Sequence, residues 1–325
     1  MSGRAENKQK SIDRMRAILQ DKPEYLTGFY NSLLTPREYL TAQNYTLTVL
    51  RFMKYINTFD LSAFTEDNID SYTLSLKGRK KNECSDSAKA TAYYALSKFG
   101  EYLLKRKLIS ENPVKNIDRI AIKDTPEKIA MNPDELKKVL QNIKSNTLGN
   151  VRQKGRRKPW ISRNYAIMTL LMTTGMRVTA LTEINLSDYN CENKTLTVVD
   201  KRRTHIDYIL EDGTVAALNE WIRERDKIMN GSVGEALFIS NRKSRMTSKA
   251  VRDLVSIYTQ DLDKHITPHK FRSSFATNLY EQTGDIYLVQ EAMKHRRPDT
   301  TEKYIKSHKN QSLDAGNMMR KLLES

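Results

Sequence analysis

The sequence predicts a mainly α-helical protein with a small β-sheet, divided into two domains. Three observations support this fold class. Apolar residues recur at helical spacing behind polar capping residues along most of the chain. Two β-rich runs, 195–199 and 205–210, flank a short polar turn and predict a β-hairpin. Residues 119–130 lack a clear apolar period and hold charges and a proline, which is typical of an exposed linker.

Composition places the chain among globular proteins that fold in water. Its 325 residues are enough for two domains with separate cores, and 38% hydrophobic with 29% charged residues fits that class. The longest apolar run, 166–172, is far too short to span a bilayer, and the N-terminus lacks a secretory signal. Cys84 and Cys191 form neither a disulfide framework nor a zinc-ligand pattern. We therefore expect a cytoplasmic protein without a membrane partner.

The charge of the chain indicates a polyanionic partner. The formal net charge is +16 and the isoelectric point is near 9.6. Self-repulsion of this size disfavours compact structure unless a partner neutralises it, and nucleic acid is the first candidate. A ribosomal or chromatin protein would share this charge, so charge alone does not predict catalysis.

The first domain is predicted to be a small helical bundle. Residues 1–22 predict a short amphipathic lead-in helix. Within residues 23–118, helix starts are indicated at Thr35, Thr65 and Asp86. The apolar positions of these helices are Leu40, Leu47, Leu50, Met53, Tyr93, Leu96, Phe99 and Leu103.

A basic cluster interrupts this bundle between two helices. It consists of Lys77, Arg79, Lys80 and Lys81. Such a stripe suits contacts to backbone phosphates, which are read by charge rather than by sequence. A solvated loop is the alternative.

The second domain, 131–306, is predicted to be mixed. A helix begins at Asn132 and Pro133, and a basic segment follows in which Arg156 and Arg157 are candidate DNA contacts. The most apolar helix, 162–173, forms the centre of the core and ends at Gly175. Further helices begin at Thr214 and Thr247, after the hairpin.

Three short helices follow towards the C-terminus. The first has Thr267 at its N-cap and ends near Gly284, so His269 and Arg272 lie three apart on one face of its opening turns. Asp285 caps the second helix. The third is indicated by a capping box of Asp299 and Glu302 and carries Tyr304. The buried stripe of the first two helices is Phe271, Phe275, Leu279, Ile286, Val289 and Met293.

These C-terminal residues resemble the catalytic motifs of the tyrosine recombinases, the phage-integrase and Xer-like family. The matching features are the H-x-x-R of His269 to Arg272, His295 23 residues later, and Tyr304 nine residues beyond. The segment around Arg177, TTGMRVTALTEINL, resembles the family's first arginine box. Lys201 at the hairpin tip matches the family's hairpin lysine, and the neighbouring Arg202 and Arg203 are further candidate DNA contacts. The segment ISENPVKNI, 109–117, resembles the end of the family's helical core-binding domain.

Two positions depart from the family pattern. Lys294 stands before His295 where the family usually has Gly, and Ala180 stands where it often has Glu. Glu183, one turn later, only partly replaces that carboxylate.

The resemblance implies a catalytic set with defined roles. Tyr304 is the nucleophile, His269 the general base and Lys201 the acid for the leaving 5′-oxygen. Arg177, Arg272 and His295 contact the phosphate. The sequence has no phosphate-binding Gly-rich loop and no metal-ligand spacing, so neither a metal nor another cofactor is expected.

The resemblance also implies partners and a biological role. These are double-stranded DNA with paired inverted-repeat sites, self-assembly to a dimer or tetramer, and accessory DNA-bending or directionality factors. The implied function is integration or excision, with a mobile element as the favoured substrate. An apolar patch in the tail, 307–325, docks either on a neighbouring protomer or on its own domain. A type IB-like topoisomerase and a non-catalytic DNA-binding relative remain the alternatives.

Overall fold

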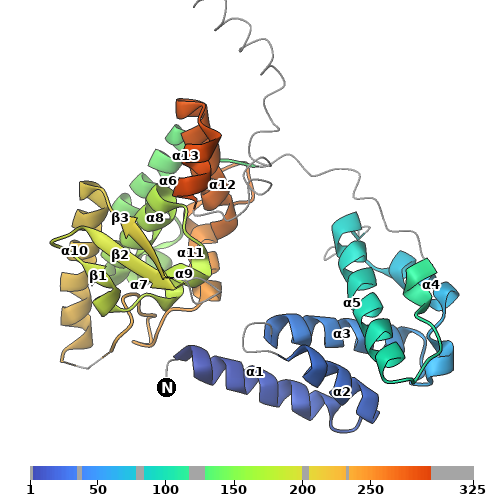
Figure 1. Cartoon of the computed structure of the whole chain (residues 1–325). Helices are drawn as coiled ribbons and strands as arrows, with labels where there is room; N and C mark the ends of the chain where they lie inside the picture. Colours follow the sequence, from blue (N-terminus) through green and yellow to red (C-terminus); the bar gives the residue numbers. More distant parts are fainter. Residues whose placement is uncertain are drawn as a thin grey trace, which may run out of the picture. The chain divides into compact units, whose positions relative to one another are not determined.

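The computed structural model describes residues 3–34, 39–77, 84–116, 129–199, 205–231 and 234–293 (Figure 1). The chain divides into two compact units, Met1–Thr125 and Pro126–Ser325. In the first unit every described regular element is helical, and the second adds a three-stranded sheet to its helices. The mainly helical fold with a small sheet is therefore confirmed. No helix in the described ranges is long and apolar enough to cross a membrane.

The first unit is a bundle with an aromatic core. Its α-helices are α1 (Gly3–Leu19), α2 (Glu24–Leu33), α3 (Tyr39–Tyr55), α4 (Glu66–Ser75) and α5 (Asp86–Lys105). Phe29 and Phe64 both pack edge-on against Phe99, with ring centroids 5.1 and 5.4 Å apart. Helix α1 is an integral part of this bundle, because Met15 and Leu19 are buried in the same core.

In this unit the helix cap predicted at Thr65 is confirmed, whereas one apolar position predicted for α3 is wrong. Thr65 caps α4 by accepting a hydrogen bond from the Asn68 backbone, as expected. Leu40 is 55% exposed, which contradicts its predicted place in the stripe of α3. The buried face of that helix is Ala42, Thr46, Val49, Phe52 and Met53. Leu40 lies two residues before Ala42, so it points to roughly the opposite side. The expected helix start at Thr35 lies outside the described residues.

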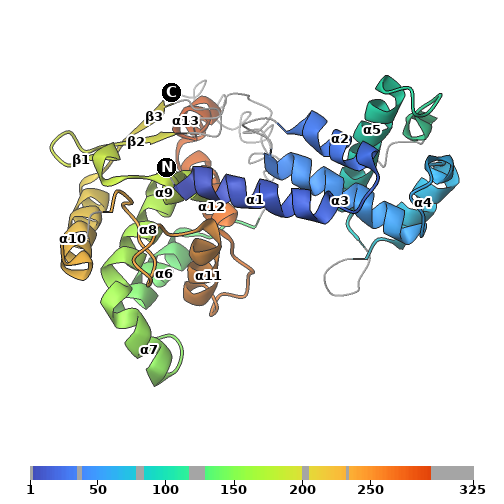
Figure 2. The same ribbon diagram turned by 90° about the horizontal axis from the view of Figure 1, so that it is seen from below.

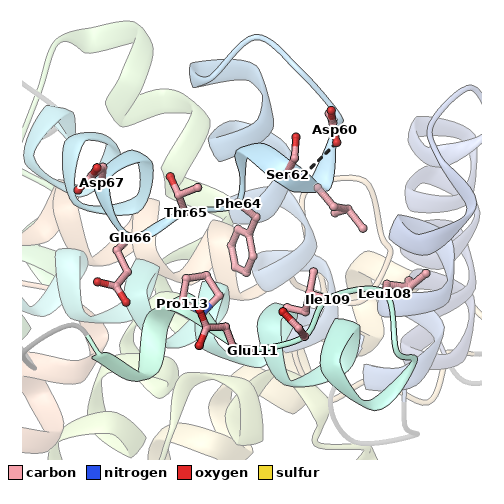
Figure 3. Close-up of a pocket in the computed structure, with 12 residues that line it drawn as sticks. Asp60, Ser62, Phe64, Thr65, Glu66, Asp67, Leu108, Ile109, Glu111 and Pro113 are labelled. Atoms are coloured by element: carbon pink, nitrogen blue, oxygen red, sulfur yellow. Dashed lines mark hydrogen bonds between the residues drawn. The ribbon is translucent and has the colours of Figure 1, made fainter.

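An acidic pocket of about 700 Å³ opens on the first unit (Figure 3). The side chain of Phe64 lines it between the loop after α3 and the loop after α5. Asp60 caps the short 3-10 helix η1 (Leu61–Ala63), and the hydrogen bonds it receives from Ser62 lower the pKa of the Asp60 carboxyl. All lining residues belong to this unit, so the pocket contains none of the predicted catalytic residues. Its acidic members are Asp60, Glu66, Asp67 and Glu111.

The second unit is built around one buried helix, α8 (Ile161–Thr174), which packs on α6, α10 and α12 (Figure 1, Figure 2). Its central residues, 166–171, are all buried, as the apolar run predicted. The other α-helices of the unit are α6 (Pro133–Ser145), α7 (Val151–Arg157), α9 (Val178–Glu183), α10 (Asp212–Met229), α11 (Ser248–Tyr258), α12 (Pro268–Thr283) and α13 (Ile286–Ala292).

The sheet is antiparallel, in the order β1 (Tyr189–Asn190), β2 (Thr195–Val199) and β3 (His205–Ile209). The predicted hairpin is confirmed, with Val199 opposite His205 at the last described pair before its loop. Leu196 and Val198 are buried on one face, which is the alternation expected of a half-buried strand. The two-residue strand β1 was not predicted, because its sequence is too short for a period to appear.

A glycine in the first bundle provides a test of its packing. A Cβ added at Gly100 in α5 would lie 2.1 Å from Oδ1 of the buried Asn112. Asn112 is fixed there by its own bonds, donating to the Ser97 carbonyl and accepting from the Val114 backbone. We expect Gly100→Ala to lower the unfolding free energy by about 2 kcal/mol, measured by denaturant unfolding. The matched change Gly155→Ala in α7, where nothing lies within 4 Å, should instead stabilise by about 0.5–1 kcal/mol. Equal effects at both positions would contradict the packing at Gly100.

Candidate active site

The candidate site begins at helix α12, which carries the H-x-x-R motif. Thr267 occupies the N-cap position with Pro268 at the first helical position, although the Thr267 side chain makes no cap hydrogen bond. His269 is exposed in the opening turn, whereas Arg272 is only 3% exposed. Burial lowers the pKa of Lys270 between them. The two motif residues therefore share a helix but occupy different environments.

The Arg272 guanidinium joins three segments of the unit. One terminal nitrogen donates to the carbonyl of Gly175, and the other donates to the carbonyl of Met293, 2.6 Å away. Gly175 precedes Arg177 by two residues, and Met293 precedes His295 by two residues. One buried cation therefore ties the helix of His269 to the chain leading into two other motif positions.

The turn at Gly175 requires a glycine. Its φ is +58°, the left-handed conformation that ends α8. A Cβ there would lie 2.6 Å from the Phe275 ring and 3.3 Å from the sulfur of Met293. The backbone of this turn thus lies directly against α12 and the end of α13, which brings the Gly175 carbonyl within reach of Arg272.

Arg177 follows this turn at the N-cap position of α9, with an exposed side chain. Ala180, one of the two departures from the family pattern, packs against the hydrophobic core. The methyl group at this position contributes to packing and supplies no carboxylate to support an arginine. Glu183 is half-buried at the end of the same helix.

The buried stripe predicted for α12 and α13 is confirmed in its main members. Phe271 belongs to the large core of the unit. Val289 and Met293 are buried in a small separate cluster, against which Phe275 and Leu279 pack. Asp285 caps α13 by accepting from the backbones of Tyr287 and Leu288.

The structure brings three predicted catalytic residues, Arg177, His269 and Arg272, into one unit. The other predicted catalytic positions, several candidate DNA contacts and Lys294, a departure from the family pattern, lie outside the described residues. These are Lys201, His295, Tyr304, Lys294, Arg79, Lys80, Lys81, Arg202 and Arg203.

The described candidate DNA contacts have different surroundings. Lys77 and Arg156 are exposed. Arg157 is partly buried and donates to the Leu148 carbonyl and to Oδ1 of Asn146, with its guanidinium 5.9 Å from the Tyr258 ring centroid. Its side chain therefore joins the loop before α7 to the end of α11, in addition to any contact with DNA.

Comparison with known proteins identifies the family. The model of the phage integrase family matches residues 130–311, more than half of the chain. This chain belongs to the phage integrase family. The expected Xer-like tyrosine recombinase resemblance is thereby confirmed.

Curated relatives of this family member include two XerC tyrosine recombinases. That of Mannheimia succiniciproducens is 26% identical over 286 residues, covering 86% of this chain and 91% of the relative. That of Psychromonas ingrahamii is 27% identical over 267 residues, covering 82% and 85%.

Two solved structures share the fold of this tyrosine recombinase. The Tn1549 transposon integrase in complex with a circular intermediate DNA has a TM-score of 0.66 at 16% identity, covering 91% of this chain and 98% of the other. XerH bound to its difH substrate has a TM-score of 0.64 at 23% identity, covering 86% and 80%.

Substitution of the buried arginine tests the junction that it forms. We expect Arg272→Lys to lower the unfolding free energy by about 2 kcal/mol, because a single ammonium cannot replace a forked guanidinium between two carbonyls. Denaturant unfolding measures this. The control is Arg252→Lys on α11, where the side chain is exposed and the expected change is close to zero. Equal stability of both variants would show that the junction contributes little.

Proposed function

We propose that this chain is a site-specific DNA recombinase that cleaves and rejoins strands through a 3′-phosphotyrosyl intermediate at Tyr304. The observation that carries the proposal is the Arg272 junction. In a member of the tyrosine recombinase family, one guanidinium ties together the segments that carry the first arginine, the H-x-x-R helix and the approach to the second histidine.

The proposed chemistry follows from the charge that develops on the phosphate. A phosphodiester under attack gains negative charge on its non-bridging oxygens, so Arg177, Arg272 and His295 stabilise the transition state by donating to them. Each well-placed donor contributes on the order of 3 kcal/mol, or roughly 100- to 1000-fold in rate. Because two backbone carbonyls hold the guanidinium of Arg272, its position at the phosphate depends on how α12 is placed against those two segments.

Nucleophile and leaving group each require a proton transfer. A free tyrosine has a pKa near 10, so ionising Tyr304 costs about 4 kcal/mol at pH 7. His269, exposed in the first turn of α12, is the proposed base. Lys201 in the hairpin loop is the proposed acid for the 5′-oxygen. The phosphotyrosyl bond keeps the energy of the broken phosphodiester, so rejoining requires neither ATP nor a metal ion.

The proposed substrate is double-stranded DNA with paired inverted-repeat sites, bound by a dimer or tetramer. Fold neighbours support this proposal: XerH is bound to difH, and λ integrase forms a tetramer on a Holliday junction. Lys77, Arg79, Lys80, Lys81, Arg156, Arg157, Arg202 and Arg203 are the proposed DNA contacts. A mobile element is the proposed target, since one neighbour is a transposon integrase.

Replacement of the nucleophile is the direct test. A duplex is first selected from a random library by binding to the chain, and a nick is placed at each position in turn. We expect the wild type to form a covalent adduct on one nicked duplex, seen on a denaturing gel. Tyr304→Phe should bind the duplex normally and form no adduct, because only the phenolic oxygen is lost. An adduct with the Phe variant would assign the nucleophile to another residue.

Replacement of the lysine tests the acid. Lys201→Ala should slow cleavage by about 100-fold or more, and a 5′-phosphorothiolate substrate should largely restore the rate because sulfur leaves without a proton. The same substrate should not rescue Arg177→Ala, which loses charge stabilisation. Rescue of Arg202→Ala in place of Lys201→Ala would move the acid by one residue.

A further inference from the structure

The end of the interdomain linker is fixed to the helix that carries His269 and Arg272. Met131 is the first residue after the predicted linker, and its side chain is fully buried in the core of the second unit. Its backbone N–H donates to Oγ of Ser274, 2.7 Å away, and its carbonyl accepts from Nδ2 of Asn278, 2.8 Å away. The backbone N–H and the backbone carbonyl of Met131 are therefore both hydrogen-bonded to side chains of α12.

Ser274 and Asn278 are themselves held in place by hydrogen bonds within α12. They lie one turn apart on the same face of α12, and Ser274 is fully buried. Ser274 also donates to the Lys270 carbonyl at 2.8 Å, and Asn278 donates to the Ser274 carbonyl at 2.7 Å. The donors and acceptors thus form one continuous chain from Met131 into the backbone of the catalytic helix.

A second contact holds the residue before Met131. Nζ of Lys264 donates to the Ala130 carbonyl at 3.2 Å and pairs with Glu135 at 2.9 Å. Glu135 in turn forms the capping box of α6 with Asn132. Burial alone would raise the pKa of Glu135, but its bonds to Lys264 and to the Asn132 backbone outweigh this and lower it. The linker end is therefore held both by α12 and by Lys264 in the loop before it, and Lys264 is itself paired with α6.

The contacts with Met131 lie on the side of α12 opposite Arg272. Ser274 follows Arg272 by two residues, which is about 200° around a helix. The two sides of α12 are thus bonded to different segments: Ser274 and Asn278 hold the linker end, while Arg272 holds Gly175 and Met293. Met131 and the two segments bound by Arg272 are therefore connected through one helix, α12.

We propose that Ser274 and Asn278 are positioning residues that couple the linker to the catalytic helix, so that DNA binding by the first unit favours the active placement of Arg272. The inference rests on the proposed recombinase function. When the first unit binds DNA, the linker orients Met131, and the two hydrogen bonds orient α12. Displacements near 1 Å at a reacting centre can lower a rate by about 100-fold, so small rotations of α12 are sufficient.

The first test compares two adjacent serines in the full chain. Ser273 and Ser274 both donate to a carbonyl four residues back, but only Ser274 accepts the Met131 N–H. At saturating selected duplex, we expect Ser274→Ala to lower the rate of Tyr304 adduct formation about tenfold or more, with unchanged duplex affinity. Ser273→Ala should stay near the wild-type rate, and Ser274→Thr, which keeps the hydroxyl, should recover most of it. Equal rates for both alanine variants would overturn the proposal.

The second test separates coupling from simple support of α12. Six Gly and Ser residues inserted after Thr125, the end of the first unit, lengthen the connection and should uncouple Met131 from the first unit. The insertion should lower the adduct rate by itself, and Ser274→Ala should add little in the extended chain. If the two changes multiply, or if the insertion has no effect, the hydrogen bonds serve only local stability and the proposal is wrong.

Two controls make these outcomes decisive. Should Ser274→Ala fail to fold, Lys264→Ala replaces it, because this side chain lies partly at the surface and also holds the linker end. Lys264→Ala should lower the adduct rate in the chain of normal length and add little to the effect of the six-residue insertion. The wild-type chain and Tyr304→Phe are run beside every variant. Absence of a wild-type adduct would reject the proposed function itself, whereas a normal wild-type adduct with additive variants would reject only the coupling.

Discussion

The placement of the segments around the candidate site depends on a buried cation, Arg272. The guanidinium of Arg272 is 3% exposed and donates to two backbone carbonyls from different segments. A buried charge is stable only where it is paired or well hydrogen-bonded, so the positions of Gly175 and Met293 are not free to vary. The interaction therefore fixes the relative placement of the α8–α9 turn, α12 and the end of α13. The α8–α9 turn leads into Arg177, and α12 carries His269 and Arg272.

Close packing around the Arg272 guanidinium explains why position 175 is a glycine. Gly175 combines a left-handed φ with contact distances that leave no room for a side chain. Phe275 and Met293, which meet it, also belong to the small cluster between α12 and α13. The same side chains thus serve the hydrophobic packing of α13 and the approach of the Gly175 carbonyl to Arg272. Polar and apolar contacts at this junction cannot be changed independently.

Helix α12 combines contacts that a single helix face could not provide. Phe271 enters the main core, Phe275 packs towards α13, and Ser274 receives the linker end. A 16-residue helix offers all of these directions because its residues step about 100° around the axis. The proposed coupling uses this property, since a rigid helix moves as one body when any of its faces is pulled.

The sequence by itself determined the family, several helix starts, the hairpin and the central helix, because caps, periodicity and motif spacing are local properties. The start predicted at Thr214 is wrong, since α10 begins at Asp212 behind the cap residue Glu211. Thr65, Asn132 and Gly175 each act where the local pattern placed them. The tertiary structure alone decided which side chains hold the site. The bonds of Arg272 to Gly175 and of Ser274 to Met131 join residues 97 and 143 positions apart. No local pattern marks such partners, because folding of the whole unit brings them together. The same reason explains Leu40, whose exposure depends on which face of α3 the rest of the bundle covers.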